Sequence, residues 1–243
     1  MVIPVRAARR RGVCNRYTLI DPESAFRELT RILGVPVGPP AWVTARYNLG
    51  LMQMAPAVVA PAKQIETRAM QFGHTIPGVG KVVGNARAET LLAKRTFKTQ
   101  LASHRCLIPT TGFIDWETDG QGNKWPHLFR LSHGRPYTMA AIWQEGSPQD
   151  QVKPHFYIIT VAPNDVVGKY HDRMPLILPD NRLARWLDPA PMEQSEFAEI
   201  ARSYPAEAME ERAISDFANH VKHEGPACLA PAPPRPDQLG LGF

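Results

Sequence analysis

A cysteine among basic side chains is the first feature of this sequence that could do chemistry. Cys14 opens the run Cys-Asn-Arg-Tyr at 14–17, after a leader with four arginines and no acidic residue. Nearby positive charge lowers the pKa of a thiol and increases the fraction present as nucleophilic thiolate. The run therefore suits a nucleophile, although a poorly ordered terminus with an incidental cysteine has the same local pattern.

A second polar run, Gly-Asn-Ala-Arg-Ala-Glu-Thr at 84–90, lies at the start of a helix predicted over 86–105. Asn85 is a residue type that commonly caps helices. A helix N-terminus beside Arg87 also suits a phosphate group. The sequence leaves both interpretations open.

An aspartate stands between large apolar residues in a predicted strand. Strand periodicity puts Asp115 on one face with Phe113 and Glu117, and Ile114 and Trp116 on the other. An acid in such surroundings can have a perturbed pKa, which is typical of functional sites. An outward-facing aspartate on an amphipathic strand is the alternative.

A histidine with two charged neighbours directly precedes the apolar stretch 174–179. His171 is the side-chain type best suited to proton transfer near neutral pH. Asp172 and Arg173 follow it, and the alternative is an ordinary loop with a surface ion pair. The other seven histidines are scattered and show no metal-ligand spacing such as HExxH.

Composition restricts the class of protein. The chain has 243 residues, 44% of them hydrophobic, which is ordinary for a globular protein of one or two domains. No apolar run approaches the roughly 20 residues of a membrane span, and the start lacks a secretory apolar core. The net charge of +5 permits a polyanionic partner without requiring one. We expect a cytoplasmic protein.

The three cysteines are widely spaced and odd in number, which argues against a disulfide framework and a structural zinc site. This usage fits a reducing compartment. Cys106 lies in an apolar strand-like run and is predicted to be a buried small hydrophobe. Cys228, in a proline-rich segment, is interpreted as incidental.

The elements that must position these residues are mainly strands. A helix is predicted at 21–34, with Asp21 as its cap and Gly34 as its end. Strands are predicted at 51–59, 64–72, 106–117, 127–132, 136–144, 155–163 and 174–179, and further helices at 181–187 and 194–204. Because strands occur in runs rather than alternating with helices, we expect an α+β fold with mostly antiparallel strands.

Together these runs resemble the SRAP family, the SOS-response-associated peptidases or abasic-site processing proteins. The resemblance is carried by five motifs in order: CNRY (14–17), RYN (46–48), NARAET (85–90), RCLIPTTGFIDW (105–116) and HDRMPLILP (171–179). It implies a barrel-like SRAP domain over 13–224. Residues 1–12 are then a non-native or cleaved leader, and residues 225–243, with five prolines between 226 and 236, a disordered tail.

The resemblance also implies a function. Family members bind single-stranded DNA and capture abasic sites covalently, with no metal or organic cofactor and as monomers. Cys14 corresponds to the nucleophile, and the residues Asn85, Asp115 and His171 to its catalytic partners. The matching DNA-binding positions are Arg16, Arg46, Asn48, Arg87 and Arg173. The peptidase label of the family implies a possible autoproteolytic activity.

The chemistry requires a cysteine that is the first residue of the chain. A free 1,2-aminothiol closes on an aldehyde to give a five-membered thiazolidine, whereas the nitrogen of an internal cysteine is a non-nucleophilic amide. As written, Cys14 is internal. Either translation starts at Val13, since GTG encodes valine internally and methionine at a start, or the chain cleaves itself before Cys14.

Three departures from the usual family pattern bear on activity. Asn15 stands where the family usually has glycine, and Asp115 where it usually has glutamate. The stretch FGHTIPGVG (72–80) lacks the two tryptophans of the family. Two other functions remain open: a DNA-binding module without covalent chemistry, and an N-terminal-nucleophile hydrolase acting on peptides or amides.

Overall fold

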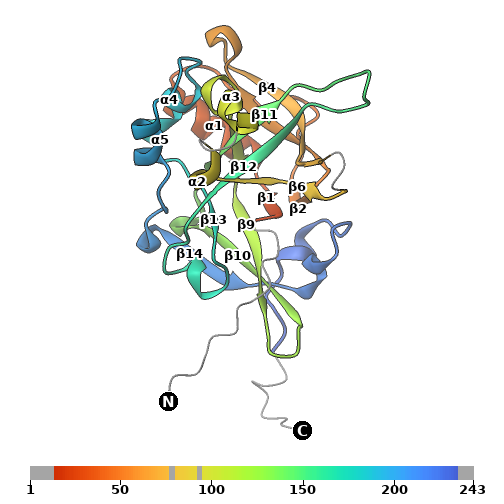
Figure 1. Cartoon of the computed structure of the whole chain (residues 1–243). Coiled ribbons are helices and arrows are strands. Elements are labelled where there is room, and N and C mark those ends of the chain that lie inside the picture. Colours follow the sequence, from red (N-terminus) through yellow and green to blue (C-terminus); the bar gives the residue numbers. More distant parts are fainter. Residues whose placement is uncertain (1–13, 77–79, 92–94, 235–243) are drawn as a thin grey trace, which may run out of the picture.

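The described part of the chain has two large β-sheets, helices around one of them, and a separate two-stranded sheet (Figure 1). The computed structural model describes residues 14–76, 80–91 and 95–234. Most strand pairings are antiparallel, so the expected α+β class is confirmed. The leader expected at 1–12 lies outside the described residues.

Five strands close into a barrel in the order β11-β8-β3-β4-β12, because β12 pairs again with β11. Only the β4–β12 pairing in this ring is parallel. The strands are β3 (Met54–Val59), β4 (Glu66–Phe72), β8 (Arg105–Thr110), β11 (Tyr137–Gln144) and β12 (His155–Val161). A separate pair, β5 (His74–Thr75) and β6 (Val82–Val83), lies beside the barrel.

The C-terminal half of β12 is flanked by two short strands that carry polar runs. The strand β7 (Asn85–Arg87) pairs in parallel with the stretch Ile158–Thr160. On the other side, β13 (Met174–Pro175) pairs antiparallel with the end of β12. Two motifs that are far apart in sequence are thereby brought to one strand.

The second sheet has the order β14-β10-β9-β1-β2 and lies below the barrel in Figure 1. Its strands are β1 (Arg16–Leu19), β2 (Arg46–Gly50), β9 (Gly112–Thr118), β10 (Lys124–Leu131) and β14 (Met209–Ala213). The β1–β9 register pairs Arg16 with Ile114. This register brings the residues before Arg16 alongside those after Ile114, and so brings Cys14 toward Asp115.

The single strand expected at 106–117 is two strands that belong to different sheets. β8 is part of the barrel and β9 part of the second sheet, and the chain changes sheet at Thr111. Thr111 donates its backbone N–H to the Thr18 carbonyl oxygen, and the two hydroxyls lie 2.9 Å apart. Gly112 is required at this crossing, because a Cβ there would lie 3.0 Å from the Phe129 carbonyl oxygen.

The helices are short and lie around the barrel (Figure 1). The predicted first helix is confirmed: the Asp21 side chain accepts from the Ser24 N–H at 2.9 Å, and Gly34 ends the helix with φ 69°. In the described residues no helix is long and apolar enough to cross a membrane. The helices are α1 (Pro22–Leu33), α2 (Ala88–Leu91), α3 (Arg95–Ser103), α4 (Leu183–Leu187) and α5 (Gln194–Ile200).

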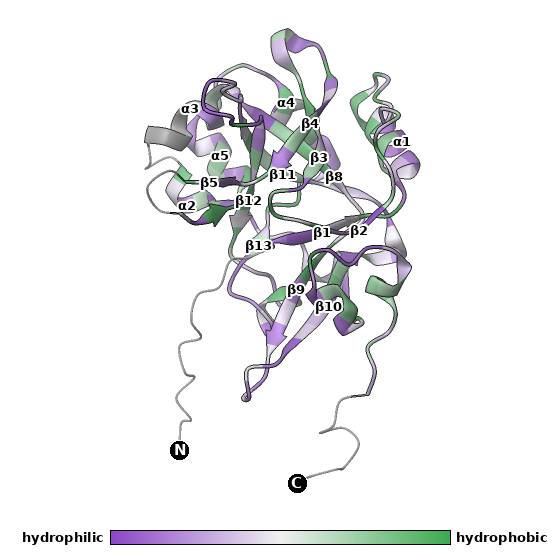
Figure 2. Ribbon diagram, turned by 90° about the vertical axis from the view of Figure 1, so that its right-hand side faces the viewer, coloured by the Kyte–Doolittle hydropathy of each residue, from purple (hydrophilic) through white to green (hydrophobic). Residues whose placement is uncertain are grey.

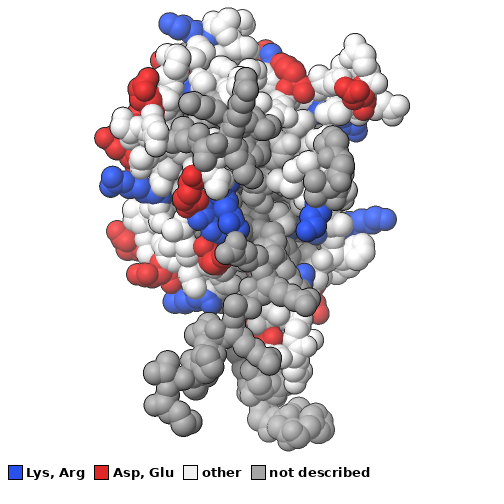
Figure 3. All heavy atoms as spheres, viewed as in Figure 1, with Lys and Arg blue, Asp and Glu red and all other residues white. Residues whose placement is uncertain are grey.

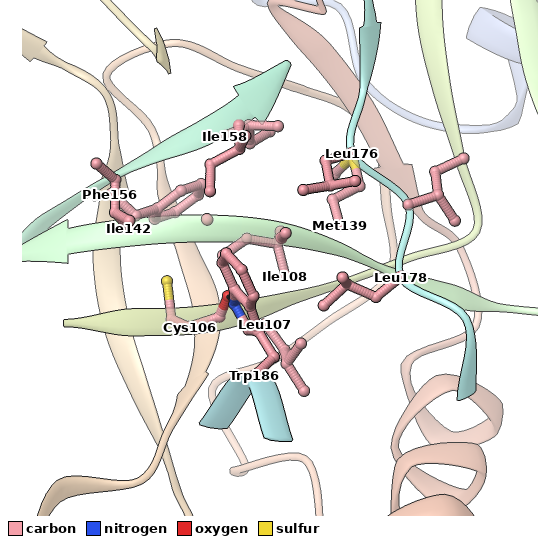
Figure 4. Packing of buried hydrophobic residues seen from close by; sticks show 14 of the residues in the cluster. Cys106, Leu107, Ile108, Met139, Ile142, Phe156, Ile158, Leu176, Leu178 and Trp186 are labelled. Atoms are coloured by element: carbon pink, nitrogen blue, oxygen red, sulfur yellow. Dashed lines mark hydrogen bonds between the residues drawn. The ribbon is translucent and has the colours of Figure 1, made fainter. Parts of the chain in front are cut away.

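The core fills the barrel and the space under the helices. Hydrophobic segments follow the barrel strands, whereas the turn between β9 and β10 is hydrophilic (Figure 2). Trp186 of α4 packs against β8 and donates its indole N–H to the Cys106 carbonyl oxygen at 3.0 Å (Figure 4). Cys106 has no exposed surface, so its prediction as a buried small hydrophobe is confirmed.

The prediction that residues 225–243 form a disordered tail is wrong for the first ten of them. The stretch Pro226–Leu229 forms a 3-10 turn in which Cys228 is fully buried, and Ile214 forms a β-bridge with Pro231. These residues join a small core cluster with Ile114 on the outer face of the second sheet. The proline-rich composition predicted disorder and gave no sign that the few apolar residues of this segment pack against the second sheet. Residues 235–243 lie outside the described residues.

This packing predicts that truncation after residue 224 destabilises the protein. Burial of an apolar side chain contributes about 1.5–3 kcal/mol, so losing Cys228 and Leu229 should lower the free energy of unfolding by at least about 2 kcal/mol. Urea unfolding measures the loss. Truncation after residue 234 retains every described residue and serves as the control; equal stability of the two truncated chains would contradict the prediction.

Candidate functional site

The polar runs meet where the C-terminal half of β12 approaches the start of β1 and the middle of β9. Cys14 lies two residues before the start of β1, and Asp115 lies on β9. Asn85 begins β7, and His171 lies in the loop before β13. The site is therefore a seam between the barrel and the second sheet, with each side chain on or beside a paired strand.

Cys14 is held rigidly in this seam. Its side chain is 1% exposed, and its backbone adopts φ 45°, a left-handed conformation that non-glycine residues seldom take. Burial raises the pKa of the Cys14 thiol well above its usual range; the Asp115 carboxylate adds to this rise and Arg173 opposes it. The basic setting read from the sequence therefore does not produce a thiolate, and the thiol is neutral at physiological pH.

Asp115 is a buried carboxyl group beside the Cys14 backbone. One oxygen, Oδ1, accepts the Trp116 N–H at 2.9 Å, and Oδ2 has no hydrogen-bond partner among the described residues. Burial raises the pKa of this carboxyl, while His171 and the backbone N–H groups of Trp116 and Cys14 oppose the rise. Asp115 is 3% exposed, so the perturbed pKa expected from the sequence is present and the outward-facing alternative is wrong.

Asn85 is part of a strand and is not a helix cap. It starts β7, and α2 begins only at Ala88. Pairing with β12 overrides the local helix signal, so the helix expected from residue 86 is wrong at its start. The Asn85 side-chain N–H donates to Oδ1 of Asn15 at 2.9 Å, which attaches the carboxamide to the residue that follows Cys14.

His171 lies in a loop that is fixed at its C-terminal side. Its Nδ1 accepts the Arg173 backbone N–H at 3.1 Å and lies 3.0 Å from the Asp172 carboxylate. The Arg173 guanidinium forms a two-pronged pair with Glu89 at 2.7 and 2.8 Å and donates to the Thr160 carbonyl oxygen at 2.5 Å. With its side chain 11% exposed, Arg173 joins the His171 loop to α2 and β12.

The remaining arginines expected to bind DNA differ in their availability. Arg87 is exposed on β7. Arg16 is half-buried; its guanidinium lies 5.8 Å from the Trp116 ring, and Nε is buried without a partner in the described structure. Arg46 is paired with Glu224 at 2.9 Å and Gln53 at 2.7 Å. A phosphate would meet Arg87 directly but would compete with a carboxylate at Arg46.

The expectation that Asn48 contacts DNA does not fit its position. Asn48 is fully buried, and its side-chain nitrogen donates to the carbonyl oxygens of Ala218, His220 and His223 at 3.0–3.2 Å. It holds the loop after β14 against β2. The polar character of the motif at 46–48 thus serves the packing of the C-terminal segment.

Sequence reasoning missed three side chains at the seam. Glu89 and Glu224 pair with Arg173 and Arg46, which were assigned to DNA binding. Apart from its acidic side chain, neither glutamate has a feature in the sequence that would have indicated this role. Tyr137, at the start of β11, has a buried hydroxyl without a partner among the described residues. Burial raises its pKa well above the usual range, and the Cys14 charge contributes to the rise. No group of three potential metal ligands is found within the described ranges.

Comparison with known proteins identifies the family of this chain. Residues 13–221 match the family described as SOS response associated peptidase, or SRAP. The chain belongs to the SRAP family. It is 32% identical over 224 residues to the abasic site processing protein YoqW of Bacillus subtilis, covering 89% of this chain and 99% of the relative. It is 27% identical over 225 residues to the abasic site processing protein YoaM of the same organism, covering 89% and 97%.

The SRAP fold is also found in solved structures. A protein from Bacteroides thetaiotaomicron superposes with a TM-score of 0.74 at 20% identity, over 90% of this chain and all of that one. At this identity the likeness shows the fold alone. The barrel expected from the resemblance is thus confirmed, both by the closed ring of five strands and by this likeness.

Each departure from the usual SRAP pattern has a structural counterpart. Asn15, in place of glycine, holds the Asn85 side chain. Asp115, where the resemblance leads us to expect glutamate, has one carboxylate oxygen without a hydrogen-bond partner in the described structure. Phe72, in place of a tryptophan, is fully buried and stacks on Phe156 at 5.3 Å, so it offers no surface to a DNA base. Residues 77–79 of that stretch lie outside the described residues.

The buried carboxyl predicts a specific dependence of stability on pH. Because the folded pKa of Asp115 is raised, the folded protein holds a proton that the unfolded chain releases above its ordinary pKa of about 3.9. Wild-type stability should therefore fall as pH rises above that value. In Asp115→Asn this loss should be absent. The free energy of unfolding, measured with urea between about pH 4 and 6, should therefore increase with pH in the variant relative to wild type. The increase should reach up to about 1.4 kcal/mol for each unit by which the folded pKa of Asp115 exceeds the unfolded pKa.

Asp119→Asn is the matched control for this measurement. Hydrogen bonds from Asn123 and Trp125 lower the pKa of the exposed Asp119 to about 2. Its contribution to stability is fully present above about pH 3.9 and is lost only as pH falls toward about 2. The difference between this variant and wild type should stay constant over the range measured. A constant difference for Asp115→Asn as well would contradict the raised pKa.

Proposed function

We propose that this protein captures abasic sites in single-stranded DNA covalently, through the nitrogen and thiol of Cys14. Two relatives that align over 89% of the chain are named abasic site processing proteins. The observation that carries the proposal is the Cys14 nitrogen beside the buried Asp115 carboxyl, whose Oδ2 is unpaired in the described structure. A buried unpaired acceptor costs about 1–3 kcal/mol, and a reacting amine would satisfy it.

The reaction begins at the aldehyde of the ring-opened abasic sugar. The free amine of Cys14 adds to the carbonyl carbon and gives a carbinolamine. Loss of water then gives an imine. The thiol adds across the carbon–nitrogen double bond, with sulfur bonding to carbon and the thiol proton passing to nitrogen, which closes the thiazolidine. One water is released in all, and no electrons are gained or lost.

A raised pKa fits Asp115 to the dehydration step. A carboxyl group with a raised pKa keeps its proton to a higher pH than an exposed aspartate, and it can protonate the departing hydroxyl of the carbinolamine and then accept a proton from nitrogen. His171, which acts electrostatically on Asp115, is assigned proton transfer during opening of the sugar ring. Asn85 is assigned a hydrogen bond to the developing hydroxyl group. The neutral thiol reacts last, because the imine carbon then lies beside it.

A free amine on Cys14 is a requirement of this chemistry. An α-amino group has a pKa of about 7.7–8.0, so a useful fraction is neutral at physiological pH. The family match begins at residue 13, which supports a mature chain whose first residue is Cys14. A translation start at Val13 and cleavage before Cys14 both produce it.

DNA binding is assigned to Arg87 and Arg16, with Arg46 and Arg173 available only where a phosphate displaces a carboxylate. Among the described residues on the face drawn in Figure 3, basic and acidic side chains are interspersed. Binding through a few phosphates should be independent of sequence and should weaken with salt. Affinity is then modest, and the covalent bond provides the lasting attachment.

An oligonucleotide with one abasic site tests the proposal. Protein expressed with its initiator methionine at position 13 should give an adduct that survives heat and denaturant. Cys14→Ala should give no adduct and should bind the same strand within about twofold, because the arginines remain. The full chain from Met1, if unprocessed, should not react. Denaturing gels give the adduct yield, and mass spectrometry of the native N-terminus identifies the first residue.

Three outcomes would contradict the proposal. Equal adduct formation by an unprocessed chain would show that the Cys14 amine is not required. Binding without an adduct would indicate a non-covalent DNA-binding module. Turnover of peptides or amides, without DNA binding, would indicate an N-terminal-nucleophile hydrolase.

The contact between Asn15 and Asn85 predicts that Asn15 slows capture. Its side chain occupies the Asn85 N–H that the substrate would use. In Asn15→Ala the capture rate should rise about three- to tenfold, because the competing hydrogen bond that is removed contributes about 1 kcal/mol. Asn15→Asp retains an acceptor of the same size and is the control that should remain slow. An unchanged rate in Asn15→Ala would exclude this competition.

A further inference from the structure

A cluster of polar side chains lies on β10 and β14, beside the seam and outside the residues assigned to the reaction. His127 of β10 is directly opposite Asp115 in the β9–β10 register. Cross-strand neighbours point to the same face of a sheet, so the two side chains are adjacent. His127 is 3% exposed; its Nδ1 lies 2.5 Å from the Glu211 carboxylate and its Nε2 lies 3.4 Å from that of Glu117.

Tyr170 connects this cluster to the catalytic loop. Its hydroxyl donates to the second oxygen of Glu211 at 2.9 Å. Its ring lies 4.2 Å from the His127 ring and packs edge-on against Phe129 at 5.6 Å. One carboxylate, Glu211, therefore binds both the histidine beside Asp115 and the residue immediately before His171.

Packing alone does not require ionisable groups at this place. On the same face of the sheet, Phe113 and Phe129 stack at 4.9 Å and fill the neighbouring space with apolar rings. A buried ion pair is often no more stabilising than apolar side chains of similar volume. The contacts of Glu211 with His127 and Tyr170 fix the start of the loop at 170–173.

The loop is anchored at both ends. Tyr170 is held by Glu211, and Arg173 is held by Glu89 and by the Thr160 carbonyl oxygen. Between these anchors, His171 is bonded through its backbone N–H to the Val167 carbonyl oxygen at 3.0 Å. The side chain of Asp172 is 68% exposed and that of His171 is 15% exposed, so the two anchors and the burial of the His171 side chain together determine where His171 lies.

We propose that His127, Glu211 and Tyr170 are positioning residues that hold His171 against Asp115 and Cys14. Each of them acts on the site through a neighbouring residue. His127 packs beside Asp115, Tyr170 fixes the backbone that carries His171, and Glu211 couples the two. The effect of these residues on the capture rate rests on the proposed capture of abasic sites. Their effect on the placement of His171 rests on the structure alone.

Tyr170→Phe tests the inference, because it removes one hydroxyl and keeps the ring against His127 and Phe129. In protein with a free Cys14 amine, the capture rate should fall about tenfold, since misplacing a catalytic group by about 1 Å can cost up to about 100-fold. Binding of the abasic strand and the melting temperature should stay close to wild type. Tyr157→Phe is the matched control: its hydroxyl contacts His155 at 3.1 Å in the barrel, and its capture rate should be unchanged.

A second measurement separates positioning from general structure. The ring resonances of His171 in NMR spectra of the full chain, assigned with His171→Gln, should move in Tyr170→Phe and not in Tyr157→Phe. Glu211→Gln should slow capture as well, and the double variant with Tyr170→Phe should be no slower than the worse single variant. Independent effects that multiply would contradict a single coupled cluster.

The two readouts distinguish failure of this inference from failure of the proposed function. If wild type forms the adduct while Tyr170→Phe leaves both the rate and the His171 resonances unchanged, the inference is overturned and the function stands. If wild type forms no adduct, the proposed function fails. The NMR comparison then still decides the placement of His171: shifted resonances support the inference and unshifted resonances overturn it.

Discussion

The position of the Cys14 nitrogen against a buried carboxyl group is the constraint on which the rest of the site depends. Asp115 is removed from water, so its pKa is raised and its charged form needs compensation. The backbone N–H of Cys14 and the nearby His171 supply part of it. The same burial keeps the thiol of Cys14 protonated. The nitrogen and sulfur atoms of Cys14 are thereby held in a buried seam beside one carboxyl group.

The seam exists because two sheets share a narrow region around β12. The barrel brings β7 and β13 to the two sides of this strand, and the second sheet brings Cys14 and Asp115 to face them. Each catalytic candidate therefore lies on or beside a hydrogen-bonded strand. Hydrogen bonds at Tyr170 and Arg173 extend this rigidity to the one loop that contributes, the loop of His171.

Carboxylates decide which basic side chains are available to DNA. Glu89 pairs with Arg173 and Glu224 with Arg46, so two of the four arginines already have anionic partners. Such pairs are screened by salt and stabilise little where they are exposed. They do lower the positive potential that an approaching polyanion would meet.

The sequence by itself determined which residue types gather at the site and several local structures. The caps of α1, the burial of Cys106 and the unusual surroundings of Asp115 follow from neighbours within a few residues. The tertiary structure alone decided that Asn85 lies in a strand, that Asn48 is buried, that the chain changes sheet at Thr111, and that Cys228 completes a core. Each of these features depends on contacts with a segment that is distant along the chain. The free energy of such contacts outweighs local propensity, and the neighbouring sequence carries no pattern that would predict them.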